Sequence, residues 1–99
     1  MQAQTLSLCR EIDAWMLKSG IRNAGWYVGI TSDIEERLFG HHQAPRGNHW
    51  WIYRRCPNAT EARELEAAYH RAGCRGAGGG GDNTAVYIYA YVITSVTVE

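Results

Sequence analysis

Residues 86–92 alternate strictly between tyrosines and smaller apolar side chains. Tyr87, Tyr89 and Tyr91 fall at every second position, and successive side chains of a strand point to opposite faces of a sheet. The segment, about residues 85–93, is therefore predicted to be a strand with one tyrosine face and one aliphatic face. A strand is stable only when it is paired, so the rest of the chain must supply a sheet around it.

Two other segments are predicted to be strands of that sheet. Residues 26–30 combine aromatic and β-branched side chains after Gly25, and residues 49–56 hold a run of aromatic residues that ends before a proline. Adjacent residues of a strand face opposite sides. One of the neighbouring tryptophans, Trp50 and Trp51, should therefore be buried and the other exposed.

Residues 5–18 are predicted to form a helix that docks on the sheet. Their apolar positions recur at helical spacing, and Gly20 is a stop signal. The apolar face consists of Leu8, Ile12, Trp15 and Met16.

Two further helices are predicted from capping patterns. One begins after Ser32, which forms a capping-box pattern with Glu35, and ends before a proline-glycine loop. The other begins after Asn58, which forms the same pattern with Glu61, and ends near Gly73.

Length and composition fit a single α+β domain over residues 1–99, with a small antiparallel sheet of about three strands flanked by three helices. An apolar content of 45% with 20% charged residues is typical of globular proteins and excludes a disordered chain. No apolar run is long enough to span a membrane, and residues 1–8 lack the pattern of a secretory signal. We therefore expect a cytoplasmic location and no membrane partner.

Charge and cysteine usage exclude further classes. Ten basic and ten acidic residues give zero formal net charge, which argues against a protein that coats long nucleic acid. Between residues 37 and 75, however, seven arginines stand against three glutamates, so a local positive patch is predicted. Cys9, Cys56 and Cys74 form no close pair, which fits neither a disulfide framework nor a standard zinc site, and we expect them to be buried apolar residues.

A candidate site is indicated by the second and third helices. Arg37 and His41 are one helical turn apart, so their side chains share a face. On the third helix Glu66 falls within the apolar stripe, whereas Glu61 and Glu64 fall outside it. A carboxylate on a core-facing stripe is costly unless a cation compensates its charge. Either a bound metal ion or a structural ion pair between Arg37 and Glu66 would supply that compensation.

The run Trp26–His41 resembles the second tyrosine motif of the GIY-YIG nucleases, a family that includes intron-homing endonucleases and the nuclease module of bacterial excision repair. The residues that carry the resemblance are Tyr27, Gly29, Arg37 and His41. A later alanine, four residues before Glu66, matches the helix that bears the family's catalytic glutamate. The resemblance extends over residues 25–73, roughly half of the chain.

The resemblance implies metal-dependent cleavage of phosphodiester bonds. Glu66 would hold Mg²⁺ or another divalent cation that polarises the scissile phosphate. Arg37 would stabilise charge on the phosphoryl oxygens, and Tyr27 or His41 would position or deprotonate the attacking water. The expected partner is nucleic acid or a nucleotide. Assembly into a homo-oligomer is a further open expectation, because the family's separate DNA-recognition module is missing.

The chain departs from the family at the first tyrosine motif, which is absent before Tyr27. As a replacement we consider the C-terminal strand, which would lie beside the strand of Tyr27 and lend Tyr87 or Tyr89 to the site. A face of three tyrosines is also typical of a half-exposed packing surface. The family's late asparagine could correspond to Asn83.

Two non-catalytic alternatives stay open. An inactive GIY-YIG-like module could sequester a nucleotide signal, as some small phage or mobile-element protein would, through stacking side chains and the amides of residues 76–81, with no cofactor. The residues expected to contact a ligand are Trp26, Gly29, Arg46, His49, Asn83, Tyr87 and Tyr89. A protein-interaction module would instead use His49, Trp50 and Trp51.

Overall fold

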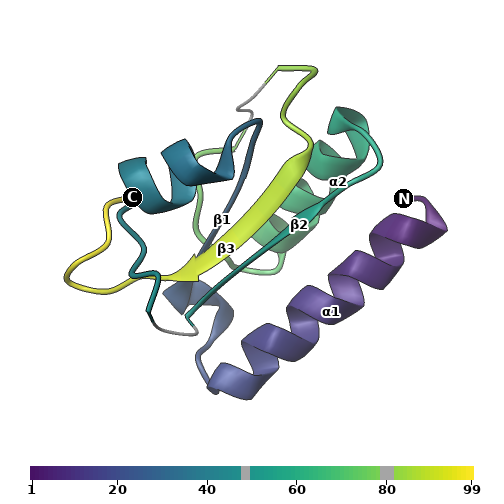
Figure 1. Cartoon of the computed structure of the whole chain (residues 1–99). Coiled ribbons are helices and arrows are strands. Elements are labelled where there is room, and N and C mark those ends of the chain that lie inside the picture. The colour runs from purple at the N-terminus through teal and green to yellow at the C-terminus, as the bar shows by residue number, and fades with distance from the viewer. Residues whose placement is uncertain (48–49, 79–81) are drawn as a thin grey trace.

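The chain folds around a three-stranded antiparallel sheet. The computed structural model describes residues 1–47, 50–78 and 82–99. Strand β1 spans Trp26–Thr31, β2 spans Trp51–Arg55 and β3 spans Tyr87–Val92. The last strand in sequence lies between the other two, so the order is β1-β3-β2 (Figure 1). This arrangement confirms the α+β class and the prediction that the C-terminal strand lies beside the strand of Tyr27.

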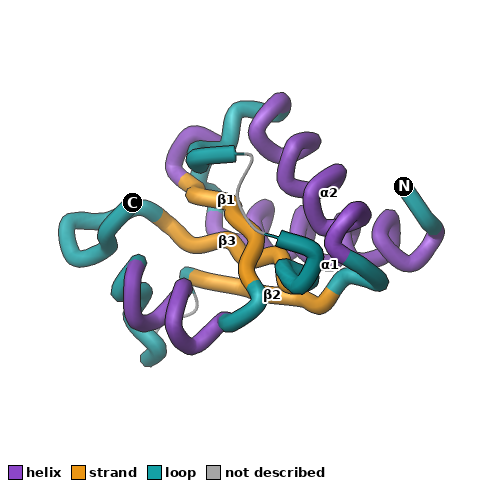
Figure 2. Tube along the Cα trace, turned by 90° about the horizontal axis from the view of Figure 1, so that it is seen from above, coloured by secondary structure: helices purple, strands orange, loops and turns teal. Residues whose placement is uncertain are grey.

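Helices lie on both faces of this sheet. Helix α1, Ala3–Ser19, and helix α2, Ala59–Arg71, pack on the aliphatic face. The shorter helix η2, Glu35–His41, packs on the tyrosine face, so the sheet forms the middle layer (Figure 2). A single 3-10 turn, η1, Asn23–Gly25, leads into β1.

The two faces of β3 enter two different apolar clusters. Ile88 packs with Ile12 of α1 on one face, and all of its surface is buried. Tyr89 and Tyr91 pack with Leu38 of η2 on the other face. The alternation predicted for this strand is therefore confirmed, and it assigns one face to the main core and the other to the aromatic cluster.

The predicted stop and start signals of α1 and α2 are confirmed. Gly20 after α1 and Gly73 after α2 have φ values of 71° and 107°, in the left-handed region that glycine adopts without steric cost. At the start of α2 the side chain of Asn58 accepts a hydrogen bond from the amide of Glu61, at 2.9 Å.

The predicted capping box of Ser32 and Glu35 is wrong. The side chain that caps this turn is Asp33, which accepts a hydrogen bond from the amide of Glu36 at 3.2 Å. The Thr31 hydroxyl accepts the amide of Asp33 at 3.0 Å and holds the turn after β1. The acceptor therefore lies one residue later than the pattern predicted.

Glu61 is also placed differently from the prediction. It is buried, with 6% of its surface exposed, rather than outside the apolar stripe. Its carboxylate accepts hydrogen bonds from the amide of Gln2 and from the hydroxyl of Thr5. These bonds hold the pKa of Glu61 below its usual value and tie the first turn of α1 to the first turn of α2.

The two neighbouring tryptophans follow the expected split only in part. Trp50 is exposed, whereas Trp51 is half-buried rather than a core residue. The indole N–H of Trp51 donates to the carbonyl of Pro45 at 3.1 Å, and its ring meets the edge of Phe39. Trp51 therefore fastens β2 to the segment after η2.

The three cysteines differ in how deeply they are buried. Cys56 and Cys74 are buried, as predicted, and burial raises the pKa of both thiols to about 11. Cys9 is only partly buried.

Within the described ranges, no helix has the length and apolar character needed to cross a membrane.

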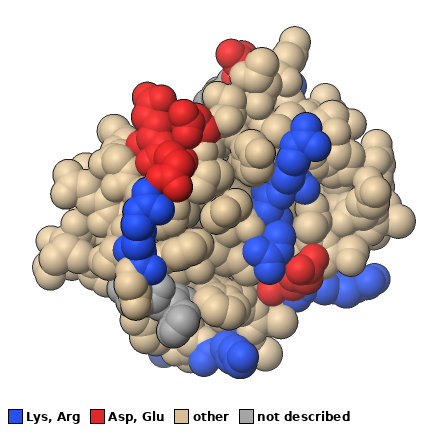
Figure 3. All heavy atoms as spheres, viewed as in Figure 1, with Lys and Arg blue, Asp and Glu red and all other residues tan. Residues whose placement is uncertain are grey.

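Basic side chains do not form one continuous patch on the face shown in Figure 3, where acidic atoms lie beside basic ones. Arg46 pairs with Glu35, and Arg54 pairs with Glu11. Ion pairs thus neutralise part of the arginine-rich segment that was predicted to be positive.

Candidate active site

The residues predicted to be catalytic line one pocket of about 240 Å³. Tyr27 comes from β1, Arg37 and His41 come from η2, and Glu66 comes from α2. Tyr89 of β3 joins them, as the strand-replacement hypothesis expects. Four elements, of which β1 and η2 are consecutive in the chain, therefore meet at one place.

Arg37 and His41 reach the pocket from a helix wound more loosely than an α-helix. The amide of His42 donates to the carbonyl of Arg37, five residues earlier, at 2.9 Å, so η2 is a π-helix. His41 is exposed beside the pocket, and the next residue, His42, is turned inward with only 2% of its surface exposed. Single π-turns are frequent at functional sites, and here one gives the pocket two histidines in different environments.

Glu66 lines the pocket as a buried carboxylate, with 6% of its surface exposed. Burial raises the pKa of Glu66, and the nearby His70 opposes this effect. In the part of the chain that the structure describes, no ion pair joins Glu66 to Arg37. The structural ion pair that the sequence left open is therefore not formed, and the carboxylate keeps its capacity to bind a cation.

Tyr89 lies across the sheet from Gly29, its partner in the β1–β3 register. Its hydroxyl occupies the position to which a Cβ atom at residue 29 would project, far inside van der Waals contact. Gly29 is therefore required for the ring to cross β1 and line the pocket. The ring lies nearly parallel to that of Tyr27, with 6.5 Å between the centroids.

His42 determines the hydrogen-bonding role of Tyr89. Nδ1 of His42 lies 2.6 Å from the carbonyl of Val98, which can only accept, so this nitrogen carries the ring proton. Burial lowers the pKa of His42 and favours the neutral ring, which leaves a lone pair on Nε2. The hydroxyl of Tyr89 donates to that nitrogen at 2.8 Å. The Tyr89 oxygen can then only accept hydrogen bonds from the pocket.

The surroundings of Glu66 fit an open site for a divalent cation better than a site in which protein ligands enclose the metal ion. Mg²⁺ binds through one or two carboxylates and keeps water ligands for the substrate side, which one buried, unpaired glutamate in a phosphate-sized pocket can support. Among the described residues, no cluster of three or more His, Cys, Asp or Glu side chains could enclose a metal ion. Glu66 would thus hold such a cation together with the substrate.

Four of the predicted ligand-binding residues lie away from this pocket, and one of them, Tyr87, lines a different hollow. Trp26 is fully buried in the main core on the aliphatic face, and its indole N–H has no hydrogen-bond partner in the described part of the chain. Arg46 is exposed and engaged by an ion pair on η2. Asn83 is exposed in the turn before β3. His49, which was also predicted to contact a ligand, lies outside the described residues.

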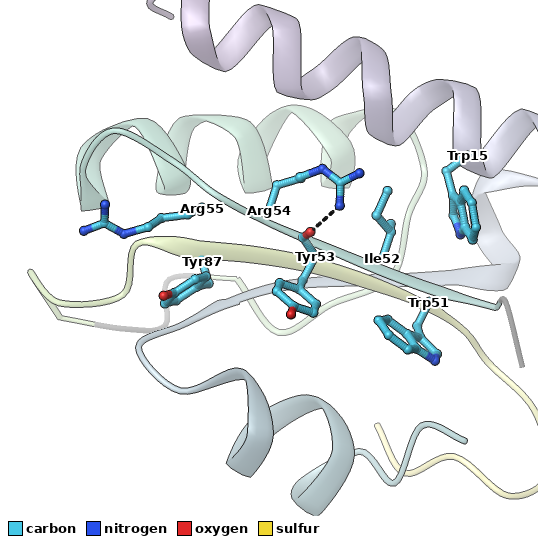
Figure 4. A pocket seen from close by; sticks show the side chains of 7 residues that line it. All are labelled: Trp15, Trp51, Ile52, Tyr53, Arg54, Arg55 and Tyr87. Carbon is cyan, nitrogen blue, oxygen red and sulfur yellow. Dashed lines mark hydrogen bonds between the residues drawn. The ribbon is translucent and has the colours of Figure 1, made fainter. Parts of the chain in front are cut away.

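A second hollow, of about 510 Å³, runs along the outer edge of β2 (Figure 4). Its aromatic side chains are Trp15, Trp51, Tyr53 and Tyr87. Tyr87 therefore lines this hollow rather than the candidate active site. Arg54 donates to the carbonyl of Tyr53 at 2.7 Å and pairs with Glu11 of α1 at 3.2 Å. This charged side chain covers part of the strand edge, a common protection against edge-to-edge pairing.

Two ionisable residues that line the active-site pocket, His42 and Glu99, were not predicted from the sequence. Helical periodicity placed His41 on the face of Arg37, and only the π-winding of η2 brings the following residue inward. Glu99 lies in a tail without periodicity, where it pairs with Arg75 at 3.0 Å. Neither position carries a signal that spacing alone could detect.

Comparison with known proteins adds no relative, because no family model, curated protein or solved structure matches the chain. A functional assignment therefore depends on the pocket geometry and on the chemistry of its side chains.

Proposed function

We propose that this pocket hydrolyses phosphodiester bonds of nucleic acid in a divalent-cation-dependent reaction of the GIY-YIG type. The observation that carries the proposal is the buried carboxylate of Glu66, which shares a pocket with Arg37 without forming an ion pair with it. A carboxylate and a guanidinium that share a pocket and stay unpaired can bind a cation and an anion together. A phosphate with its associated cation has both charges.

The role of each residue follows from its environment. Arg37 would donate hydrogen bonds to the phosphoryl oxygens as negative charge develops on them. Tyr89, whose proton is directed to His42, would accept a hydrogen bond from the attacking water and orient it. Glu66 would hold the divalent cation, whose contribution is to polarise the phosphate and stabilise the leaving oxygen.

The size of the pocket favours a phosphate group over a whole nucleotide. Its volume of about 240 Å³ lies below the range of about 300–1,000 Å³ that is typical of pockets enclosing small-molecule ligands. A phosphodiester group suits that volume if its sugars and bases stay outside the pocket. Tyr27 and His41 would then line the space around the phosphate. Sequestration of a free nucleotide is the alternative, and the following experiment separates the two.

The test is a nicking assay on supercoiled plasmid and on labelled single-stranded DNA, with Mg²⁺ or with a chelator. We expect the wild-type protein to cut only with the metal ion and Glu66→Gln to lose cutting. Glu64→Gln is the matched control, because Glu64 is an exposed carboxylate two residues away on the same helix. Cutting that survives in Glu66→Gln would contradict the proposal. Nucleotide binding without cutting under any divalent cation would favour the sequestering alternative.

A further inference from the structure

Two neighbouring hollows are both lined by Tyr27, and we refer to the two together as the trough. The active-site pocket shares Tyr27, Ala77 and Glu99 with a neighbouring hollow of about 450 Å³. Arg75 and His70 line the neighbouring hollow and not the active-site pocket. The candidate active site therefore lies next to a second hollow beside β1.

Arg75 is held at the edge of β1 by its backbone. Its amide donates to the carbonyl of Trp26 and its carbonyl accepts from the amide of Val28, each at 2.8 Å. These bonds form a parallel bridge opposite Tyr27. The side chain of Arg75 is 58% exposed, and its ion-pair partner is Glu99, at 3.0 Å. A cation carried by a backbone that is fixed against β1 thus lines the trough.

Glu99 binds Arg75 in the way that a phosphate would. A carboxylate and a phosphate both present oxygen pairs that match the guanidinium fork. The side chain of Glu99 is 39% exposed, and an exposed ion pair contributes little stability. A phosphate, which also binds a guanidinium strongly, can therefore replace it on Arg75.

We propose that Arg75 forms a second phosphate subsite, which binds the phosphate adjacent to the scissile one on the same nucleic-acid strand and displaces Glu99. The inference rests on the proposed function, since it takes the pocket of Arg37 as the place of the scissile phosphate. The strand passes Tyr27 with one phosphate on each side of that ring. Glu99 competes with the adjacent phosphate and lowers the affinity for nucleic acid.

The test measures binding in the presence of a chelator, so that nothing is cut. The probes are a short fluorescent single-stranded oligodeoxynucleotide, followed by anisotropy, and a deoxynucleoside monophosphate, followed by NMR. The variants are Arg75→Gln, Glu99→Gln and the double variant. Arg71→Gln is the matched control, because Arg71 is exposed four residues away and lines neither hollow. Melting temperatures confirm that every variant is folded.

Arg75→Gln should weaken oligonucleotide binding about tenfold and reduce the slope of log affinity against log salt by about 0.7, the value for one phosphate contact on a single strand. Mononucleotide binding, which uses one phosphate, should stay within about twofold. Glu99→Gln should tighten oligonucleotide binding about twofold to fivefold, and this gain should vanish in the double variant. An unchanged affinity in Arg75→Gln, an equal loss in Arg71→Gln, or an equal loss of mononucleotide binding would each overturn the subsite.

The binding test of the Arg75 subsite and the cleavage test of the proposed function can fail independently of each other. A protein that cuts DNA but binds it equally well with Arg75→Gln would keep the hydrolysis and lose the subsite. A protein that shows the expected binding pattern but never cuts would keep the subsite and lose the hydrolysis.

Discussion

The hydroxyl oxygen of Tyr89 and Nε2 of His42 are 2.8 Å apart, although the two residues are separated by 47 positions in the chain. The tyrosine is the donor, because the other ring nitrogen of His42 is committed to the carbonyl of Val98. The pair decides what Tyr89 offers to the pocket, which is an acceptor and not a donor. The polarity of the pocket therefore depends on a histidine that the helical spacing did not single out.

Replacing His42 with alanine should destabilise the protein by about 2–4 kcal/mol. The substitution removes a buried ring and leaves the hydroxyl of Tyr89 without its acceptor, while the carbonyl of Val98 keeps only the hydroxyl of Tyr91 as a side-chain donor, at 3.2 Å. Urea denaturation measures the loss. His41→Ala is the matched control, since that neighbouring histidine is exposed and its removal should change stability by about 0.5 kcal/mol or less. Equal losses in the two variants would show that the buried network contributes nothing.

Stability should also fall as the pH is lowered below about 6.5. Burial lowers the pKa of His42, and the charges of His41 and Arg37 lower it further, against the opposing effects of Val98 and Glu99. Between this lowered pKa and about 6.5 the unfolded chain binds more protons than the folded one, so stability rises with pH in that window and is unaffected by this group above it.

Urea denaturation of the wild type and of His42→Gln, repeated over a series of pH values, checks this dependence. The variant should lack the slope just below pH 6.5. The pKa values of Glu61 and Glu35 are both lowered from the ordinary value of 4.5. These carboxylates lose their contribution to stability only below that pH, so their effect is separable from that of His42. Because the raised pKa of Glu66 gives a slope of opposite sign, the comparison decides: equal slopes in the wild type and in His42→Gln between pH 5 and about 6.5 would contradict the prediction for His42.

Gly29→Ala should cost about 1–3 kcal/mol and impair any activity of the pocket, because the new Cβ would collide with the hydroxyl and ring of Tyr89. Gly47→Ala is the control, since a Cβ at residue 47 meets no atom within 4 Å. If the collision is the cause, Gly29→Ala should be much less costly in a Tyr89→Ala background than in the wild type, which a double-mutant cycle measures. A cost that is the same in both backgrounds would point to the backbone instead.

Glu66→Gln should lower cleavage about a hundredfold or more while the melting temperature stays equal or rises. Activity falls because the cation loses its carboxylate. Stability does not fall, because burial already disfavours the charged form of Glu66 and no ion pair with Arg37 is lost. Arg37→Ala should likewise leave the melting temperature within a few degrees while it weakens substrate binding. A large drop in melting temperature for either variant would indicate a structural pair.

Much of the fold could be predicted because local rules and tertiary packing agree in these segments. The alternation in β3 determines which side chains enter each cluster, and Gly20 and Gly73 end helices for a steric reason that is visible in any sequence. The meeting of Tyr27, Arg37 and Glu66 in one pocket was expected from the resemblance to the GIY-YIG family and from the place of Glu66 on an apolar helical stripe. For the strand and the two helix ends, a short-range pattern carried the necessary information.

The remaining features depend on contacts between distant segments. The π-winding of η2 has no compositional signature, so helical periodicity favoured His41 and missed His42. Glu61 is buried only because α1 supplies Gln2 and Thr5 as donors to its carboxylate. Glu99 acquires its place in the trough from its ion pair with Arg75, which no local pattern indicates.

The central place of β3 has a consequence for how the protein folds. β1 and β2 both form their ladders with β3, and Tyr27 pairs with a residue 64 positions later, Tyr91. During synthesis the first two strands therefore leave the ribosome without a neighbour, and their aromatic side chains and strand edges stay exposed until residues 87–92 have emerged. The sheet and the pocket are then completed in one late event, which makes binding of chaperones to the nascent chain most important in the interval between β2 and β3.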